Sequence, residues 1–162
     1  ILDRPRHHDL ISLVRKTGAR IKLIADGDVS AVIATTVEDS GVDLYLGSGG
    51  SPEGVLAAAA LRCLGGKIYG KLMFSSEVDK KRAVDMGISD LNKIYETNEL
   101  ASGEVMFAAT GVTDGTFLKG VRIKNNIALT HSVIMRSKTK TVRYVKASHN
   151  LKIKPIISHY NS

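Results

Sequence analysis

The chain has 162 residues, enough for one domain with a hydrophobic core. Hydrophobic residues make up 43% of it and charged residues 24%, which is typical of a globular protein that folds in water. The longest apolar stretch, Val55 to Leu61, is far too short to span a bilayer, and charged residues interrupt the first apolar residues, which argues against a signal peptide. The single cysteine, Cys63, excludes an internal disulfide, so we expect a reducing compartment such as the cytoplasm.

Charge is distributed unevenly along the chain. Residues 1–114 hold 13 Lys or Arg and all 16 Asp or Glu, whereas residues 115–162 hold 10 Lys or Arg and no acid, which gives the net charge of +7. Such a basic segment suits nucleic acid, anionic lipid, phosphorylated metabolites or an acidic segment outside this chain. It lacks the spacing of an RNA-binding sheet motif or a zinc finger, so nucleic acid is the less favoured partner. Together with an opening that lacks methionine, the imbalance predicts an incomplete chain.

The first half of the chain alternates helical and strand patterns. A helix over His7 to Thr17 comes first. Three strands, each followed by a helix, come next: the strands span Ile21–Ala25, Val42–Leu46 and Ile68–Phe74, and the helices span Val29–Val37, Pro52–Leu64 and Ser76–Met86. Asp28 and Ser51 are expected as N-caps, and Gly65-Gly66 as the end of the third helix. Because the helix around Cys63 is rich in alanine and leucine, we interpret this thiol as buried and structural.

The second half has the pattern of an antiparallel sheet. Strands are expected over Val105–Ala109, Ile127–Met135 and Thr141–Ala147, with tight turns at Asn125-Asn126 and Lys138–Lys140. The whole pattern predicts an α/β fold, a layered sandwich with a largely parallel or mixed sheet, helices on both faces and an antiparallel edge. We expect residues 1–150 to form the domain and residues 151–162 to form a loosely attached tail.

Three loops of the predicted sheet carry the candidate binding residues. They are Arg4–His7, Asp26–Asp28 and Gly47–Glu53. In a parallel sheet, the loops that follow the strands emerge at one edge, where ligands bind. We therefore expect the three loops to meet.

The glycine-rich loop over Gly47–Ser51 resembles a phosphate cradle. Glycines allow backbone amides to approach a ligand, and the helix that follows presents free N–H groups. It is neither a nucleotide P-loop nor a dinucleotide fingerprint, because the required lysine and third glycine are missing. A plain tight turn before a capped helix is an equally good interpretation of the loop by itself.

Glu53 lies in the first turn of that helix. An acid there simply complements the helix dipole, by about 0.3–1 kcal/mol. Beside a phosphate cradle, however, a carboxylate would repel the phosphate unless a divalent cation lay between them. Glu53 is therefore a candidate metal ligand.

The two other loops combine charge with restricted backbone. Arg4 and Arg6 flank Pro5, which stiffens the turn and presents two guanidinium groups suited to phosphate oxygens. Asp26 and Asp28 flank Gly27, and they form a turn with a helix cap, acceptors for sugar hydroxyls or further metal ligands; the spacing alone does not separate these. His7 and His8 are interpreted as surface residues. The segments Thr110–Gly115, Thr130–Ser132 and Arg136–Lys138 are expected to be structural.

The order and spacing of these motifs resemble class II fructose-1,6-bisphosphatase. The resemblance covers nearly the whole chain to about Asn150. The motifs that carry it are Leu2–His7, Asp26-Gly27-Asp28, Gly49–Val55 with Ala57–Leu61, Phe107–Gly115, Thr130–Ser132 and Met135–Thr139.

This resemblance implies an α/β fold of the lithium-sensitive phosphatase superfamily. It implies hydrolysis of the 1-phosphate of fructose 1,6-bisphosphate to fructose 6-phosphate, a gluconeogenic step, with Mn²⁺ or Mg²⁺, in a homo-oligomer. Glu53 would bind the metal. The residues expected to contact substrate by the same resemblance are Arg4, Pro5, Arg6, Asp26, Gly27, Asp28 and Gly50.

A member of that family is about twice as long as this chain. The remaining acidic ligands and the segment that positions the attacking water would lie on an amino-terminal half, so the isolated chain is expected to be inactive. Lys140 replaces a glycine expected in the hairpin turn. Sedoheptulose 1,7-bisphosphate hydrolysis, a non-catalytic sugar-phosphate-binding or regulatory module, and a basic nucleic-acid-binding domain are the alternatives.

Overall fold

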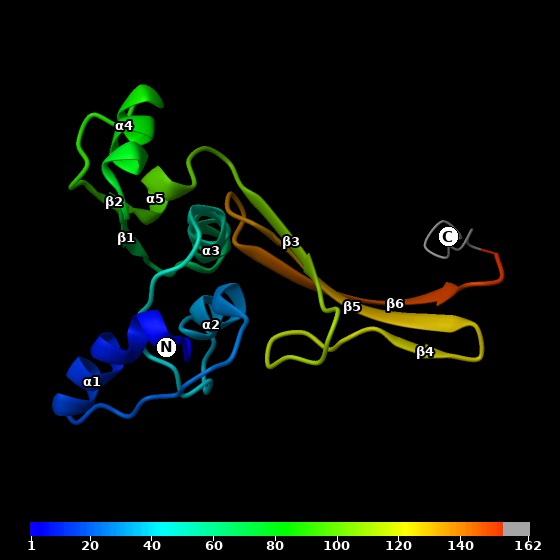
Figure 1. The fold of residues 1–162 in the computed structure, drawn as a ribbon. Helices are drawn as coiled ribbons and strands as arrows, with labels where there is room; N and C mark the ends of the chain where they lie inside the picture. The colour runs from blue at the N-terminus through cyan, green and yellow to red at the C-terminus, as the bar shows by residue number, and fades with distance from the viewer. Residues whose placement is uncertain (154–162) are drawn as a thin grey trace, which may run out of the picture.

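The computed structural model describes residues 1–153. The chain begins with a short 3-10 helix, η1 (Pro5–His7), followed by helices α1 (His8–Lys16), α2 (Asp28–Ala34) and α3 (Ser51–Leu64). A small unit follows with strand β1 (Tyr69–Lys71), helix α4 (Glu77–Asp85), strand β2 (Ile94–Glu96) and helix α5 (Thr97–Leu100). Strands β3 (Met106–Thr110), β4 (Arg122–Lys124), β5 (Ile127–Arg136) and β6 (Thr141–Asn150) complete the chain (Figure 1).

The main sheet is antiparallel and centred on β5. Along its whole length β5 pairs with β6, while β3 and β4 share the other edge of β5. The β4–β5 turn at Asn125 and Asn126 takes left-handed backbone angles at both residues, as a two-residue hairpin turn requires. This turn and the one before β6 confirm the sequence-based expectation of an antiparallel edge.

Lys140 forms the second turn although a glycine was expected there. It adopts the left-handed conformation, with φ of 52°, and its ammonium group contacts the carbonyl of Arg62 in the last turn of α3. A cation at the carboxyl end of a helix is favourable, which helps to offset the backbone cost of a side chain in this conformation.

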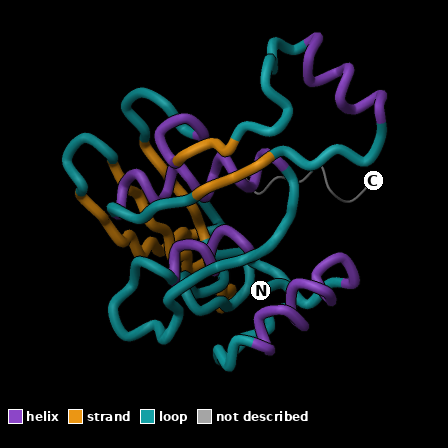
Figure 2. The backbone as a smooth tube through the Cα atoms, turned by 90° about the vertical axis from the view of Figure 1, so that its left-hand side faces the viewer, coloured by secondary structure: helices purple, strands orange, loops and turns teal. Residues whose placement is uncertain are grey.

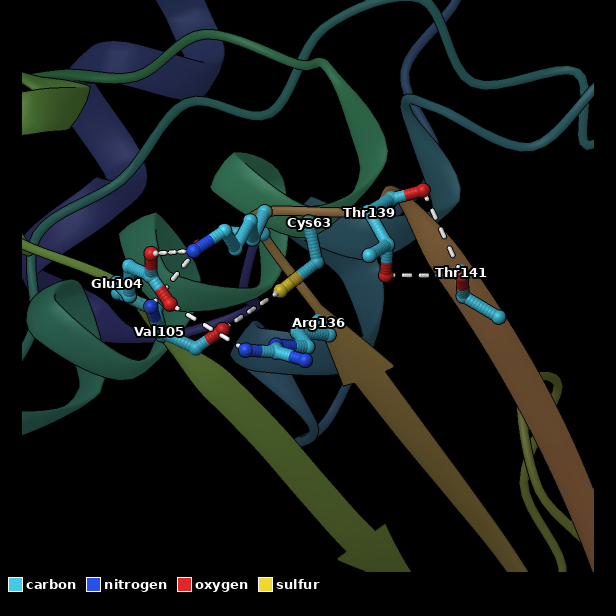
Figure 3. A network of polar contacts seen from close by, with 8 residues as sticks. Cys63, Glu104, Val105, Arg136, Thr139 and Thr141 are labelled. Atoms are coloured by element: carbon cyan, nitrogen blue, oxygen red, sulfur yellow. Dashed lines mark hydrogen bonds and ion pairs between the residues drawn. The ribbon is translucent and has the colours of Figure 1, made fainter.

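The core lies between this sheet and helices α2 and α3. Val133 and Met135 of β5 are completely buried against a cluster that includes Ile33 of α2 and Cys63 of α3. Burial of each large apolar side chain stabilises the fold by about 1.5–3 kcal/mol. Cys63 is 1% exposed, its thiol points to the carbonyl of Val105, and burial raises its pKa, which confirms a structural thiol (Figure 3).

Charged residues join the start of β3 to the end of β5. The Glu104 carboxylate contacts Lys138 at 2.7 Å and Arg136 at 3.3 Å (Figure 3). Ser137 accepts a hydrogen bond from the N–H of Val105. Residues 136–138 therefore have the structural role expected of them.

The prediction of a largely parallel sheet is wrong for this chain. Every strand pair in residues 1–153 is antiparallel, and the only parallel contact described there is one isolated bridge between Leu2 and Ile24. The segments Ile21–Ala25 and Val42–Leu46 are not strands, because neither has a neighbour that continues a ladder. The third expected strand shortens to β1, which pairs with the unexpected β2.

Helices do not cover both faces of the main sheet as expected. Figures 1 and 2 show α1 and α4 standing away from the four-stranded sheet, while α2 and α3 gather at one end of it. The described part of the chain is thus an α/β structure without the complete layering of a sandwich. None of its helices is long and apolar enough to cross a bilayer.

Helix boundaries follow the sequence closely but the caps differ. Gly27 and Gly50, rather than Asp28 and Ser51, are the N-caps of α2 and α3, and neither cap makes a side-chain hydrogen bond. Helix α2 also ends at Ala34, before the expected Val37. Gly65, with φ of 90°, ends α3 as predicted, and its N–H donates to the carbonyl of Leu61. The expected tail begins as a turn at residues 151–153, and its remainder lies outside the described residues.

Candidate functional site

The Arg4–His7 loop has the restricted backbone that its proline predicts. Arg4 is extended, with φ of −137° and ψ of 147°, because the residue before a proline is excluded from the helical region. The chain then turns through η1 into α1. Both arginine side chains are exposed.

His7 anchors this loop and is not the surface residue we expected. It is 2% exposed, and its Nδ1 lies 2.9 Å from the carbonyl oxygen of Leu2. The N–H of Ser48 donates to its Nε2 at 2.9 Å. Since Nε2 accepts, Nδ1 carries the proton and donates to Leu2, so the imidazole is neutral. Its neighbour His8 is exposed, as expected.

Arg6 lies against the same part of the glycine-rich loop. Its Nε donates to the carbonyl of Ser48 at 3.0 Å. The terminal nitrogens of Arg6 have no hydrogen-bond partner within residues 1–153, so four of the five guanidinium N–H groups face solvent. The guanidinium is therefore oriented at one end and free to bind an anion at the other.

Asp28 approaches Gly49, the residue that follows Ser48 in the glycine-rich loop. A side-chain carbon added at Gly49 would lie 3.4 Å from Oδ2 of Asp28, so the carboxylate lies about one carbon atom away from this glycine. Gly27 precedes Asp28 in the left-handed conformation, with φ of 80°, which turns the chain into α2. Asp26 is exposed before that turn.

The Glu53 side chain lies beside Gly50, the residue that follows Gly49. A side-chain carbon at Gly50 would lie 2.2 Å from Oε2 of Glu53, so only a glycine leaves this carboxylate where it is. The carboxylate is exposed at the first turn of α3. Pro52 keeps the same turn rigid, since its ring fixes φ and the missing N–H is not needed there.

The three predicted loops therefore meet. Arg6 donates to the Ser48 carbonyl and the Asp28 carboxylate lies beside Gly49, so the Arg4–His7 and Asp26–Asp28 loops both approach the Gly47–Glu53 loop, which carries Glu53. Tyr45 lies beside them: burial and the Asp28 carboxylate raise the pKa of its phenol, and Arg6 opposes that rise. Figure 1 shows the amino terminus, α2 and the start of α3 side by side.

His7, Tyr45 and Ser48 were not among the residues predicted for this site. A histidine after Arg-Pro-Arg carries no signal of burial, and the role of Ser48 depends on a contact with a residue 41 positions away. The signal that was available is position, since Ser48 lies inside the predicted cradle.

The Thr110–Gly115 loop is the structural turn we expected. Asp114 accepts from the N–H of Gly120 at 2.9 Å and contacts Arg122 at 3.3 Å, and both interactions lower the pKa of its carboxyl. Gly111 faces the carbonyl of Lys119 so closely that a side-chain carbon would lie 2.3 Å away. In β5, Ser132 shares a hydrogen bond with the hydroxyl of Thr110, and His131 accepts from the N–H of Lys119.

The described residues do not contain a complete metal centre. No group of three His, Cys, Asp or Glu side chains in residues 1–153 is arranged to hold a metal ion. A single exposed carboxylate such as that of Glu53 suits a hard cation that takes its other ligands elsewhere, because Mg²⁺ often uses only one or two protein carboxylates. The site thus places two exposed arginines and a helix start beside one exposed carboxylate.

Arginine and helix-start amides around a carboxylate, on an α/β domain, are the groups by which proteins bind phosphorylated small molecules. Comparison with known proteins makes this specific. Residues 1–149 match the family described as bacterial fructose-1,6-bisphosphatase, glpX-encoded. The chain belongs to this family, as the resemblance of its motifs indicated.

Three cyanobacterial relatives are similar over 92% of the chain. They come from Trichodesmium erythraeum, Synechococcus sp. JA-3-3Ab and Crocosphaera subtropica and are 46%, 43% and 44% identical. Each is named D-fructose 1,6-bisphosphatase class 2/sedoheptulose 1,7-bisphosphatase. The match covers 47% of each relative, so the chain spans about half the length of these relatives.

Proposed function

We propose that this chain is the substrate-binding half of a metal-dependent sugar bisphosphatase. The reaction is hydrolysis of the 1-phosphate of fructose 1,6-bisphosphate to fructose 6-phosphate, a gluconeogenic step in the cytoplasm. Membership of the family supports this reaction class. The observation that supports the assignment to this site is the approach of Arg6 and Asp28 to Ser48 and Gly49, in the loop that also carries Glu53.

The proposed roles follow from the chemistry of each group. Arg4 and Arg6 bind phosphate, and Pro5 limits the freedom that they lose on binding. Asp26 and Asp28 accept hydrogen bonds from sugar hydroxyls, while Gly27 and Gly50 let the backbone approach the substrate.

Glu53 supplies one ligand to Mn²⁺ or Mg²⁺. When bound, such an ion lowers the pKa of water and offsets the charge of the transferred phosphoryl group. The other acidic ligands belong to the half of the relatives that this chain does not match. The complete protein then has the layered fold of the lithium-sensitive phosphatases and forms a homo-oligomer.

The proposal allows two substrates, and a non-catalytic role is the alternative for the isolated chain. The names of the relatives include sedoheptulose 1,7-bisphosphate, whose phosphate and hydroxyl groups suit the same donors and acceptors. A non-catalytic sugar-phosphate-binding module is favoured for the isolated chain by one observation: residues 1–153 lack a cluster of three metal-ligating side chains.

The test uses an extended polypeptide, in which the segment that precedes the matched region of the Trichodesmium relative is joined ahead of Ile1. With Mg²⁺ or Mn²⁺ it should release phosphate from fructose 1,6-bisphosphate. Arg6→Ala should raise KM about tenfold or more, equivalent to roughly 1.4 kcal/mol, because a charge-assisted phosphate contact is lost. Arg15→Ala, which removes an exposed arginine of α1, is the matched control. Equal KM values for the two variants would remove Arg6 from the site.

A further inference from the structure

A hollow of about 620 Å³ lies between two extended segments of the chain, residues 19–26 and 41–46. Apolar side chains such as Ile21, Val42 and Leu44 line it, and Leu44 is 68% exposed. These are the two segments in which the sequence predicted strands. Their apolar pattern indicates burial, whereas here they face open space.

The backbone on both walls of the hollow is largely unpaired. Residues 43–46 make no backbone hydrogen bond within the described chain. On the other wall only the Ala19 N–H, the Lys22 carbonyl and both backbone groups of Ile24 have partners within the described residues. Extended segments with free N–H and C=O groups are the edges to which a further strand adds.

The first three residues already begin such a strand. The N–H of Ile24 donates to the carbonyl of Ile1 at 3.1 Å, and the N–H of Asp3 donates to the carbonyl of Ile24 at 2.8 Å. The amino group of Ile1 donates to Lys22 at 3.1 Å. This ladder is parallel, with Leu2 opposite Ile24. A segment joined to Ile1 in the same direction would lie alongside residues 19–22, and Ile1 itself lines the hollow.

We propose that the hollow is the seat of a β-strand from the polypeptide that precedes Ile1 in the longer protein, and that this strand joins both walls into one sheet. The inference rests on the proposed function, in which the half of the relatives not matched here completes the enzyme. It also explains how three loops become fixed at one rim, because the Arg4–His7 loop and the Asp26–Asp28 loop both follow directly from the strands of that sheet.

A small ligand or a second copy of the chain is the competing occupant. The volume alone falls in the range of small-molecule pockets, about 300–1,000 Å³. The unpaired backbone along both walls favours a strand, since ligand pockets rely on a few converging polar groups and do not need two free edges.

Hydrogen exchange tests the proposal directly. Alternate amides of residues 43–46, those that face the added strand, should exchange rapidly in the 162-residue chain and at least tenfold more slowly in the extended polypeptide. The amides of Ala109 and Val133, which face each other in the β3–β5 ladder, report whether each protein is folded and should be protected in both. Rapid exchange at every amide of residues 43–46 in an extended polypeptide whose β3–β5 amides are protected would overturn the proposal.

Two matched substitutions provide a second measurement. Leu44 and Ile123 are both 68% exposed in this chain, and Ile123 lies on β4, outside the residues that line the hollow. Leu44→Asp should lower the urea midpoint of the extended polypeptide but not that of the 162-residue chain, whereas Ile123→Asp should have a small effect on both. An equal effect of the two substitutions contradicts the proposal.

The competing occupants give different results. Protection of residues 43–46 that rises with concentration of the 162-residue chain would assign the hollow to a second copy, and protection that requires added fructose 6-phosphate would assign it to a ligand. Either result overturns the strand. If residues 43–46 of the extended polypeptide are protected but no phosphate is released, the strand is supported and the proposed function is rejected. If phosphate is released but these amides are unprotected, the proposed function is supported and the strand is rejected.

Discussion

At the scale of single residues, the candidate site depends on one buried imidazole. His7 connects the carbonyl of Leu2 to the N–H of Ser48, so it holds the arginine loop and the glycine-rich loop at a fixed separation. The arginines themselves are exposed and make few contacts. Their positions therefore depend on His7 and on the hydrogen bond from Arg6 to the Ser48 carbonyl.

Removal of His7 should destabilise the 162-residue chain. His7→Ala leaves the Ser48 N–H without its acceptor, and an unsatisfied polar group costs about 1–3 kcal/mol. His8→Ala, at the exposed neighbouring position, should change the free energy of unfolding by less than about 0.5 kcal/mol. Urea unfolding of both variants measures the difference, and similar midpoints would show that His7 is not an anchor.

Glu53 is the residue whose proposed role concerns turnover. In the extended polypeptide, Glu53→Gln should lower kcat or raise the metal concentration required by roughly tenfold, which corresponds to about 1.4 kcal/mol. Glu77→Gln, which removes an acid from the first turn of α4, controls for the loss of a favourable helix-dipole interaction. Turnover unchanged by Glu53→Gln over a full metal titration would exclude it as a ligand.

At the scale of elements, α3 connects the core to the site. Its alanine-rich middle packs on the sheet, with Ala58 and Ala60 completely buried, while its first turn carries Gly50 and Glu53. The sequence predicted this helix to within one residue, because proline at the start and glycine at the end are strong boundary signals. It misplaced the cap, since Ser51 and Gly50 are both acceptable at that position.

Gly54, inside α3, and Gly65, at its carboxyl end, allow the effect of backbone strain to be distinguished from that of packing. Gly65 has φ of 90° and nothing within 4 Å of an added side-chain carbon, so Gly65→Ala should cost about 1–2 kcal/mol through backbone strain alone. Gly54 lies inside the helix with equally open surroundings, so Gly54→Ala should stabilise the chain by about 0.5–1 kcal/mol. Thermal and urea unfolding of the two variants check the opposite signs; the same sign for both would contradict the assigned boundary.

At the scale of the whole molecule, the second half pairs its strands into a sheet, whereas two segments of the first half stay largely unpaired. Strands β4, β5 and β6 pair as successive hairpins, because partners that are joined by a short turn are close in sequence. Within residues 1–153, the segment around Ile21 pairs only through the Leu2–Ile24 bridge, and the segment around Val42 has no strand partner. A chain that spans 47% of its relatives thus holds the rim of a site and lacks a cluster of metal ligands in its described part.

The 162-residue chain by itself should therefore release no phosphate from fructose 1,6-bisphosphate. One carboxylate of Glu53 cannot both activate water and stabilise the leaving oxygen, which two-metal sites achieve with several acidic ligands. Phosphate release with Mg²⁺ and with Mn²⁺, measured beside the extended polypeptide, checks this. Metal-dependent activity of the short chain that Glu53→Gln abolishes would contradict it.

The sequence alone determined the helices, the antiparallel hairpins and the family, because these depend on local spacing, turn residues and motif order. It also predicted that three loops meet. Only the tertiary structure decided that His7 is buried, that Ser48 and Gly49 are the residues that the other two loops approach, and that the first predicted strands stay largely unpaired. The physical reason is that burial and strand pairing depend on which distant segment lies alongside, and local sequence does not specify that segment.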